Sequence, residues 1–284
     1  KKEADFLVNN NPAIPYFYCL PKIHKGTLPP RGRPVVSGIN SLLEPVSKFC
    51  DSFLQPIVSH ISTYLKDTKE VLNLIDSLNS KGATNFLITL DVEVLYTSIP
   101  QEATLEVVET SLHNSTWGSI TPIHFLMECA SLALKENFFK FKNTLYLQTR
   151  GTSVGSTFAP SLACLYMFHF ETTYILNDTN PFKEDISSWK WYIDDILITW
   201  NGDERRAEDF CLWINNLDPF LKFSNHTSKY QLPFLDLMIT INEGRLETKT
   251  YTKTTDRNSL LRFESHSPKA LRTNLPYGQF LRVW

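Results

Sequence analysis

Long apolar runs, paired cysteines and repeated segments are all missing from this sequence of 284 residues. No apolar run approaches the roughly 18 residues that would indicate a membrane span, so we expect no membrane partner. The five cysteines are odd in number and never form a C-x-x-C pair, which argues against a disulfide framework or a zinc site and fits a reducing compartment. With 10 glycines and 16 prolines, collagen-like and low-complexity chains are excluded as well.

A signal peptide and an initiator Met are also missing, because the chain begins Lys1-Lys2-Glu3. We therefore expect a piece of a longer protein. Hydrophobic residues make up 42% of the chain and charged residues 20%, which predicts a folded core large enough for one large domain or two modest ones.

Charge is unevenly distributed although the net charge is only −2. Residues 1–50 carry a net +4 and residues 245–284 a net +5, which leaves −11 for the centre. An acidic centre that collects divalent cations, between basic segments that hold phosphates, suits an enzyme acting on nucleic acid. Ordinary solvated surface charge is the alternative explanation.

Hydrophobic periodicity predicts mixed helices and strands. The first forty residues are rich in Pro and Gly and should be extended segments and turns. Helical spacing of apolar residues, Pro at helix starts and a capping box at Asp67 and Glu70 predict helices over 43–65, 67–78, 100–113, 122–137, 158–176 and 204–217. Short β-type runs predict strands over 86–91, 189–193, 196–200, 235–240 and 246–250, and two more within 138–147.

Three carboxylates lie at the ends of predicted strands. Asp91 ends the run 86–91, while Asp194 and Asp195 occupy the turn between two apolar β-runs. Neighbouring like charges repel, so a compensating cation is expected. Three carboxylates can hold two Mg²⁺ ions about 3.5–4 Å apart, one activating an attacking hydroxyl and the other stabilising a leaving pyrophosphate. Acidic residues are also common in ordinary turns, so the pair by itself leaves both interpretations open.

The order of several motifs resembles the palm of reverse transcriptases. The matching segments are LDVEVLYTSIP at 90–100, GTSVGS at 151–156 followed by AP at 159–160, YIDD at 192–195 and LPFLD at 232–236. Three others resemble Penelope-like retroelements, whose reverse transcriptase is related to telomerase: LPKIHK at 20–25, RPVVS at 33–37 and TDRN at 255–258. The resemblance covers nearly the whole chain.

This resemblance implies an α+β right-hand polymerase fold, with fingers, a palm built on an antiparallel sheet, and a thumb that is largely absent. It implies a fingers segment over 1–85 and a palm over 86–250, with inserted finger helices near 101–137. Residues 251–284 would be the end of the palm leading to the thumb.

The implied activity is RNA-directed DNA polymerisation. The enzyme would add dNTPs to the 3′ hydroxyl of a DNA primer while copying an RNA template, with two Mg²⁺ ions, or Mn²⁺ in their place. A GIY-YIG endonuclease domain is expected C-terminal to this chain. The implied location is the nucleus, and the cytoplasm during retroelement assembly.

The resemblance also assigns roles to residues. Asp91, Asp194 and Asp195 would be the catalytic, metal-binding triad, and the backbone carbonyl of Val92 a further metal ligand. Tyr96, five residues after Asp91, falls where the family places a bulky side chain under the incoming sugar to exclude a 2′ hydroxyl. An aromatic residue that packs in the core is the alternative for Tyr96.

Further residues would bind the nucleotide. Lys22, Lys25 and Arg33 match the fingers segment that contacts the triphosphate, with surface solvation as the alternative. Gly151 and Gly155 match the loop where template and nucleotide approach the backbone, and an ordinary loop before a helix explains Gly151 nearly as well.

The sequence departs from the family pattern at a few positions and leaves two other functions open. Val154 stands where many reverse transcriptases have Gln, and Trp191 where a basic residue is frequent. An RNA-dependent RNA polymerase usually has Gly-Asp-Asp and a polar residue near the position of Tyr96, so Tyr192 and Tyr96 disfavour it. The other function is that of an inactive or domesticated copy that binds RNA or DNA without chemistry. The intact acids argue against decay, yet a recently silenced copy would have the same sequence features as an active one.

Overall fold

A four-stranded antiparallel sheet organises the longer of the two units into which the chain divides, Lys1–Tyr251 and Thr252–Trp284. The computed structural model describes residues 5–21, 29–30, 32–116, 122–252, 264 and 269–283. The strand order is β6-β7-β3-β8, with bounds β3 Phe86–Val92, β6 Ile186–Tyr192, β7 Asp195–Trp200 and β8 Phe223–Ser228. The predicted α+β class with antiparallel sheets is confirmed.

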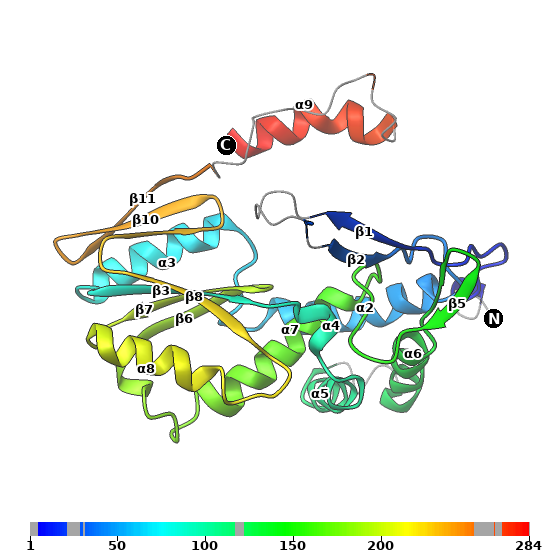
Figure 1. Cartoon of the computed structure of the whole chain (residues 1–284), viewed down its shortest axis with the longest axis horizontal. Coiled ribbons are helices and arrows are strands. Elements are labelled where there is room, and N and C mark those ends of the chain that lie inside the picture. Colours follow the sequence, from blue (N-terminus) through cyan, green and yellow to red (C-terminus); the bar gives the residue numbers. More distant parts are fainter. Residues whose placement is uncertain are drawn as a thin grey trace. The chain divides into compact units, whose positions relative to one another are not determined.

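Alternate residues of β3 face two separate hydrophobic cores. Ile88 and Leu90 lie in a core formed with α7 (Ala159–Phe170) and α8 (Glu204–Ile214). Leu87 lies in a second core formed with α3 (Thr68–Lys81) and a three-stranded sheet. Figure 1 shows α8 on one side of the central sheet and α3 on the other. The strands of the smaller sheet are β9 Gln231–Phe234, β10 Leu237–Asn242 and β11 Arg245–Thr250.

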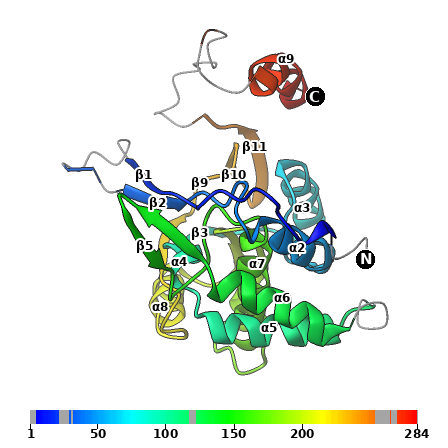
Figure 2. The same ribbon diagram turned by 90° about the vertical axis from the view of Figure 1, so that its right-hand side faces the viewer.

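Three more helices complete this side of the unit: α2 Glu44–Ser59, α5 Gln101–His113 and α6 Ile123–Lys135. Two of them, α2 and α5, pack against α7, and the third, α6, packs against α2 and α5 (Figures 1 and 2). Beside them lie two hairpins, β1 Phe17–Pro21 with β2 Gly32–Val36, and β4 Phe138–Phe141 with β5 Thr144–Leu147. The N–H of Lys140 donates to the carbonyl of Pro15 at 2.7 Å and joins the two hairpins.

The shorter unit contains α9, Lys269–Val283, with Pro276 inside the helix. In the described ranges no helix has both the length and the apolar composition needed to cross a bilayer. All five cysteines are free thiols.

Most predicted elements are present, with informative differences at their ends. The Asp67 carboxylate accepts the Glu70 N–H at 3.0 Å as expected, and the helix begins at Thr68. The helix predicted over 43–65 ends at Ser59, because the segment that follows pairs with β6 instead: the Leu65 N–H donates to the Trp191 carbonyl at 2.8 Å. The strands β8 and β9 and the helix α9 were not predicted.

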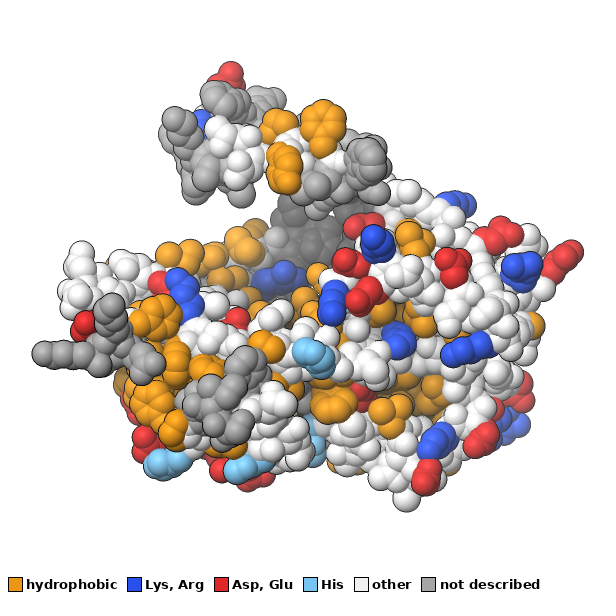
Figure 3. All heavy atoms as spheres, turned by 180° about the vertical axis from the view of Figure 1, so that it is seen from behind, with side chains coloured by type: hydrophobic (Ala, Val, Ile, Leu, Met, Phe, Trp, Pro, Cys, Tyr) orange, Lys and Arg blue, Asp and Glu red, His pale blue; other side chains and the backbone are white. Residues whose placement is uncertain are grey.

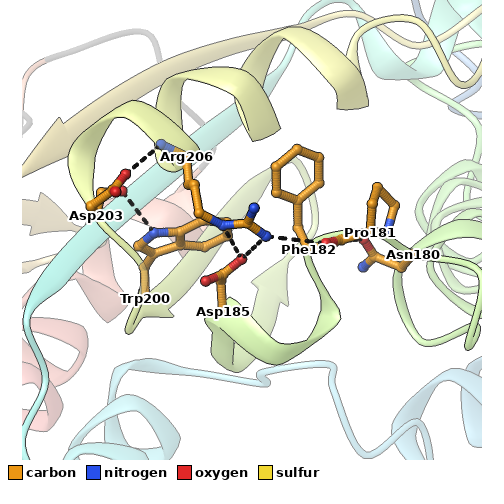
Figure 4. Close-up of polar contacts among 7 residues, drawn as sticks. All are labelled: Asn180, Pro181, Phe182, Asp185, Trp200, Asp203 and Arg206. Atoms are coloured by element: carbon orange, nitrogen blue, oxygen red, sulfur yellow. Dashed lines mark hydrogen bonds and ion pairs between the residues drawn. The ribbon is translucent and has the colours of Figure 1, made fainter.

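A side-chain network fixes the end of the β6–β7 hairpin that is remote from Asp194 (Figure 4). Arg206 of α8 donates to the Asp185 carboxylate at 2.8 Å, and its guanidinium lies 5.3 Å from the ring centroid of Phe182. The indole of Trp200 donates to the Asp203 carbonyl at 3.2 Å, and the Asp203 carboxylate caps α8 by accepting the Arg206 N–H at 2.8 Å. The start of β6, the end of β7 and the start of α8 are thereby held together.

Gly202 lies inside this network, and we expect Gly202→Ala to destabilise the protein. A Cβ there would lie 2.6 Å from Asp185 Oδ1 and 2.7 Å from Trp200 Nε1, so atoms of the network must move. Such overpacking costs about 1–3 kcal/mol, which a thermal melt would show as a lower Tm. Gly278→Ala is the control, because a Cβ at Gly278 meets nothing within 4 Å. Equal melting temperatures for the two variants would contradict the expectation.

Candidate nucleotidyl-transfer site

The register of β3 and β7 places Asp91 directly opposite Asp195. In such a pair the Cβ atoms lie about 4.5–5.5 Å apart. Side chains alternate along a strand, so both carboxylates lie on the face that also carries Leu87 and Leu197, where the second core ends. β3, which carries Asp91, is therefore a direct neighbour of the β6–β7 hairpin.

Asp194 lies in the tight turn before β7. The turn residues are Ile193 and Asp194, whereas Asp195 is already the first residue of β7, so the predicted turn is displaced by one residue. Ile193 has a φ of +54°, an unusual conformation for a β-branched residue. The Asp194 carbonyl accepts the N–H of Val92 at 2.9 Å, which ties the turn to the end of β3. Val92 itself is buried.

These carboxylates have the chemistry of a Mg²⁺ site. Asp91 is exposed and the two other carboxylates are partly exposed, so ions and substrate can reach them. Within the described ranges, no three His, Cys, Asp or Glu side chains are gathered closely enough to hold an ion by themselves. Mg²⁺ usually keeps several waters and binds one or two carboxylates plus substrate phosphates, so the opposed pair fits this ion without a complete protein cage.

Tyr96 lies in the short helix α4 (Leu95–Ser98), which follows β3 in the chain. It is half-buried and packs against the main core. Burial raises the pKa of Tyr96 to about 12, with smaller contributions from Cys164 and Asp194, while the positive charge of Arg33 lowers it. Tyr96 is therefore within electrostatic reach of both Asp194 and Arg33, two residues far away in the sequence.

Gly151 and Gly155 have a role inside the chain itself. A Cβ at Gly151 would lie 2.5 Å from the Tyr96 carbonyl oxygen, and one at Gly155 would lie 2.0 Å from the Val36 carbonyl oxygen. The loop 151–156 thus packs its backbone against α4 and against the end of β2, the strand that carries Arg33. This contact accounts for both glycines, and their predicted approach to nucleotide and template stays a prediction.

Two of the predicted nucleotide-binding residues, Lys22 and Lys25, lie outside the described residues, as does the segment 255–258. Arg33 is exposed on β2, opposite Leu20 of β1. The structure therefore pairs Asp91 with Asp195 and puts Tyr96 within electrostatic reach of Asp194 and Arg33, while in the described part of the chain the three carboxylates do not form an ion-holding cluster by themselves.

The sequence interpretation missed three neighbours of the site. Ser224 of β8 lies opposite Asp91 on the side away from β7, and no apolar alternation in Phe223–Ser228 signals this strand. The Tyr64 ring packs against Trp191 in a tilted arrangement, with ring centroids 5.0 Å apart, and burial raises the pKa of Tyr64 to about 12. Glu171 is fully buried, and its sequence signal was a single acid inside an otherwise apolar helix.

A family model for "Reverse transcriptase (RNA-dependent DNA polymerase)" matches residues 23–230. No curated protein matches the sequence.

Solved polymerases share the fold at low sequence identity. Apo telomerase from Candida tropicalis, truncated from its C-terminal domain, aligns with a TM-score of 0.61 and 13% identity over 85% of this chain and 56% of that one. Telomerase from Candida tropicalis in complex with a TWJ fragment of telomeric RNA aligns with a TM-score of 0.63 and 14% identity over 95% and 49%. The RNA-dependent RNA polymerase of BmCPV in its quiescent state gives a TM-score of 0.57 and 12% identity over 84% and 22%. This chain thus spans about half the length of the telomerase chains, and its fold is that of a polymerase.

Proposed function

This chain belongs to the reverse transcriptase family, and on that premise we propose that it is the polymerase part of an RNA-directed DNA polymerase from a Penelope-like retroelement. The observation that carries the proposal is the position of Asp91 opposite Asp195, with Asp194 tied to the same strand end. The family match and Tyr96 favour dNTPs over rNTPs as substrates. The motifs at 20–25, 33–37 and 255–258 support the Penelope-like assignment.

The residues of the site would divide the chemistry between them. Bound Mg²⁺ ions would supply the positive charge that makes the primer 3′ hydroxyl nucleophilic and stabilises the leaving pyrophosphate. Asp91 and Asp195 would bind the Mg²⁺ ions on the sheet face that also carries Leu87 and Leu197. Asp194 and the Val92 carbonyl would be the remaining protein ligands. Arg33 would bind triphosphate oxygens, because a planar guanidinium can contact two of them at once.

We expect Asp91→Asn and Asp195→Asn each to lower DNA synthesis by about a thousandfold or more, since losing a metal ligand removes several kcal/mol of transition-state stabilisation. The fold should persist, because like charges directly opposite each other on neighbouring strands are destabilising and either substitution removes one of them. The measurement is dNTP incorporation by the full-length protein on an RNA template with a DNA primer and Mg²⁺, beside a thermal melt.

Asp209→Asn is the matched control, because Asp209 is an exposed acid on α8, on the other side of the sheet. It should leave synthesis unchanged. A variant of Asp91 or Asp195 that synthesises DNA at the wild-type rate would show that its assigned role is wrong. Full-length wild-type protein that binds RNA and DNA without incorporating dNTPs would instead favour the inactive or domesticated alternative.

Tyr96 is the proposed sugar-selecting residue. Its ring is within electrostatic reach of both Asp194 and Arg33, which supports a position under the sugar of the incoming nucleotide. A ring at that point would collide with a 2′ hydroxyl of the incoming nucleotide, which discriminates against rNTPs by steric exclusion.

We expect Tyr96→Ala to raise rNTP use relative to dNTP use by about tenfold, or about 1.4 kcal/mol of lost discrimination. Tyr96→Phe keeps the ring and should keep the wild-type ratio. The measurement is the ratio of kcat/KM for rNTP and dNTP in each variant, beside a thermal melt. If Tyr96→Ala lowers both activities together and leaves the ratio unchanged, Tyr96 is a packing residue.

The two hairpins beside the helical part present a surface suited to a single-stranded template. Their exposed aromatic side chains include Tyr16, Tyr18, Phe138, Phe141 and Tyr146. Lys140 and Lys142 lie among these rings, at 5.9 Å from the Tyr16 centroid and 5.7 Å from the Phe141 centroid. Aromatic rings stack on bases and lysines attract phosphates, a combination that binds single strands. Figure 3, the view from behind, shows many exposed hydrophobic side chains at the end of this unit that carries α2, α5 and α6.

We expect the double variant Lys140→Ala, Lys142→Ala to weaken binding of single-stranded RNA and to make binding less sensitive to salt. Each phosphate contact contributes about 0.7 to the slope of log affinity against log salt for a single strand. The measurement is RNA affinity of the full-length protein at several salt concentrations. Lys81→Ala, at the end of α3, is the control and should leave the slope unchanged, and an unchanged slope in the double variant would place the template elsewhere.

Two wider features complete the proposal. A GIY-YIG endonuclease domain would follow this chain in the full-length protein, in keeping with the Penelope-like motifs. The place of action would be the nucleus, where DNA primers are available, with assembly on RNA in the cytoplasm.

A further inference from the structure

Glu171 is a fully buried acid that no step of the proposed reaction uses. It begins the π-helix Glu171–Ile175 that continues α7. Its Oε2 accepts the indole N–H groups of Trp189 at 2.9 Å and of Trp191 at 2.8 Å, and its Oε1 accepts the hydroxyl of Thr63. Burial raises the pKa of Glu171, and these hydrogen bonds oppose that rise.

This carboxylate connects three segments that are far apart in the sequence. Trp189 and Trp191 lie on β6, Thr63 lies in the segment after α2, and Glu171 lies at the end of α7. An unpaired buried polar group is costly, so the four groups hold one another in place. The strand β6 and the segment after α2 are also joined through the backbone, since the Trp191 N–H donates to the Thr63 carbonyl at 3.0 Å. The Lys190 ammonium donates to the Ser62 carbonyl at 2.6 Å.

The strand that Glu171 holds leads directly into the turn with the carboxylates. Trp191 is followed by Tyr192, which pairs with Asp195, and by Ile193 with its positive φ. Strained backbone of this kind persists when the surrounding structure over-determines it. On the β3 side the turn is held by the Val92 N–H, and on the β6 side the nearest side-chain anchor is the pair of indoles on Glu171. The π-helix is consistent with a structural requirement at this position. Single π-helical turns inside or at the end of α-helices are rare, and those that exist are often found at functional sites.

We propose that Glu171 is a positioning residue that fixes the Ile193–Asp194 turn, through Trp191 and β6, in the conformation that aligns Asp194 and Asp195 with Asp91. The alignment matters for catalysis only if the proposed function is right, but the anchoring of the turn is a property of the fold. Its test therefore combines a structural measurement with a kinetic one.

Two variants separate hydrogen bonding from volume. In Glu171→Gln the amide oxygen can accept both indole N–H groups and the amide NH₂ can donate to the Thr63 hydroxyl, so the network is kept. In Glu171→Leu the side chain has a similar size but cannot accept a hydrogen bond. We expect hydrogen exchange at the Trp191 and Leu65 amides to rise at least tenfold in Glu171→Leu and to stay near wild type in Glu171→Gln, measured on the full-length protein.

The reference points are remote from this network. The Leu246 amide, which donates to Asn79 Oδ1 at 2.8 Å, reports general loss of stability. Tyr166→Phe removes a different buried hydrogen bond of α7, the one to Asp218 at 3.0 Å, and should leave exchange at Trp191 unchanged. Should Glu171→Leu fail to fold, Thr63→Val removes one donor with nearly the same shape and should raise exchange at Trp191 by a smaller factor.

The kinetic arm follows dNTP incorporation by the same proteins. Glu171→Leu should lower kcat about tenfold and leave the KM for dNTP within twofold, whereas Glu171→Gln and Tyr166→Phe should match wild type. If the Trp191 amide exchanges at the same rate in Glu171→Leu and in wild type, the proposal is overturned. It is also overturned if exchange at the Leu246 amide rises in Glu171→Leu as much as exchange at the Trp191 amide. A rise in Trp191 exchange and a fall in kcat as large in Glu171→Gln as in Glu171→Leu would overturn the proposal as well. If the wild-type protein makes no DNA, the proposed function fails, while the exchange measurements still decide whether Glu171 anchors the turn.

Discussion

The site depends on one constraint, the antiparallel register of β3 between β7 and β8. Ile88 and Leu90 face one core while Leu87 faces the other, and β7 alternates in step. Because side chains alternate along a strand, a slip of one residue would move Asp91 to the opposite face and expose Ile88 or Leu90. Burial of apolar residues on both faces of β3 therefore determines the face on which the exposed Asp91 side chain lies.

Strain accumulates at the open end of this sheet. Ile193 and Val94, both β-branched, have φ values of +54° and +49° on either side of the carboxylates. Such conformations cost about 1–3 kcal/mol each and cluster at functional sites. The Ile193–Asp194 turn is held by the end of β3 through the Val92 N–H and, on the β6 side, by the Glu171 network. The same arrangement keeps Asp91 and Asp195 together despite their like charges.

Close backbone packing joins the β1–β2 hairpin to the central sheet. Gly155 packs against the Val36 carbonyl, and Gly151 against the Tyr96 carbonyl, so the loop 151–156 lies between β2 and α4. The Ser153 hydroxyl donates to the same Val36 carbonyl at 3.1 Å. Arg33 is therefore held near Tyr96 by contacts that leave no room for a side chain at either glycine.

The sequence by itself determined the strand that carries Asp91, the capped start of α3 and the hairpin with Asp194, because apolar alternation and capping act between near neighbours in the chain. Tertiary structure alone decided the role of β8, whose polar residues are held by backbone pairing with β3 and carry no hydrophobic pattern. It also decided the role of Glu171, whose partners lie 18, 20 and 108 residues away. The physical reason is that local patterns record which face of an element is buried, whereas hydrogen-bond partners between distant segments exist only once those segments have packed.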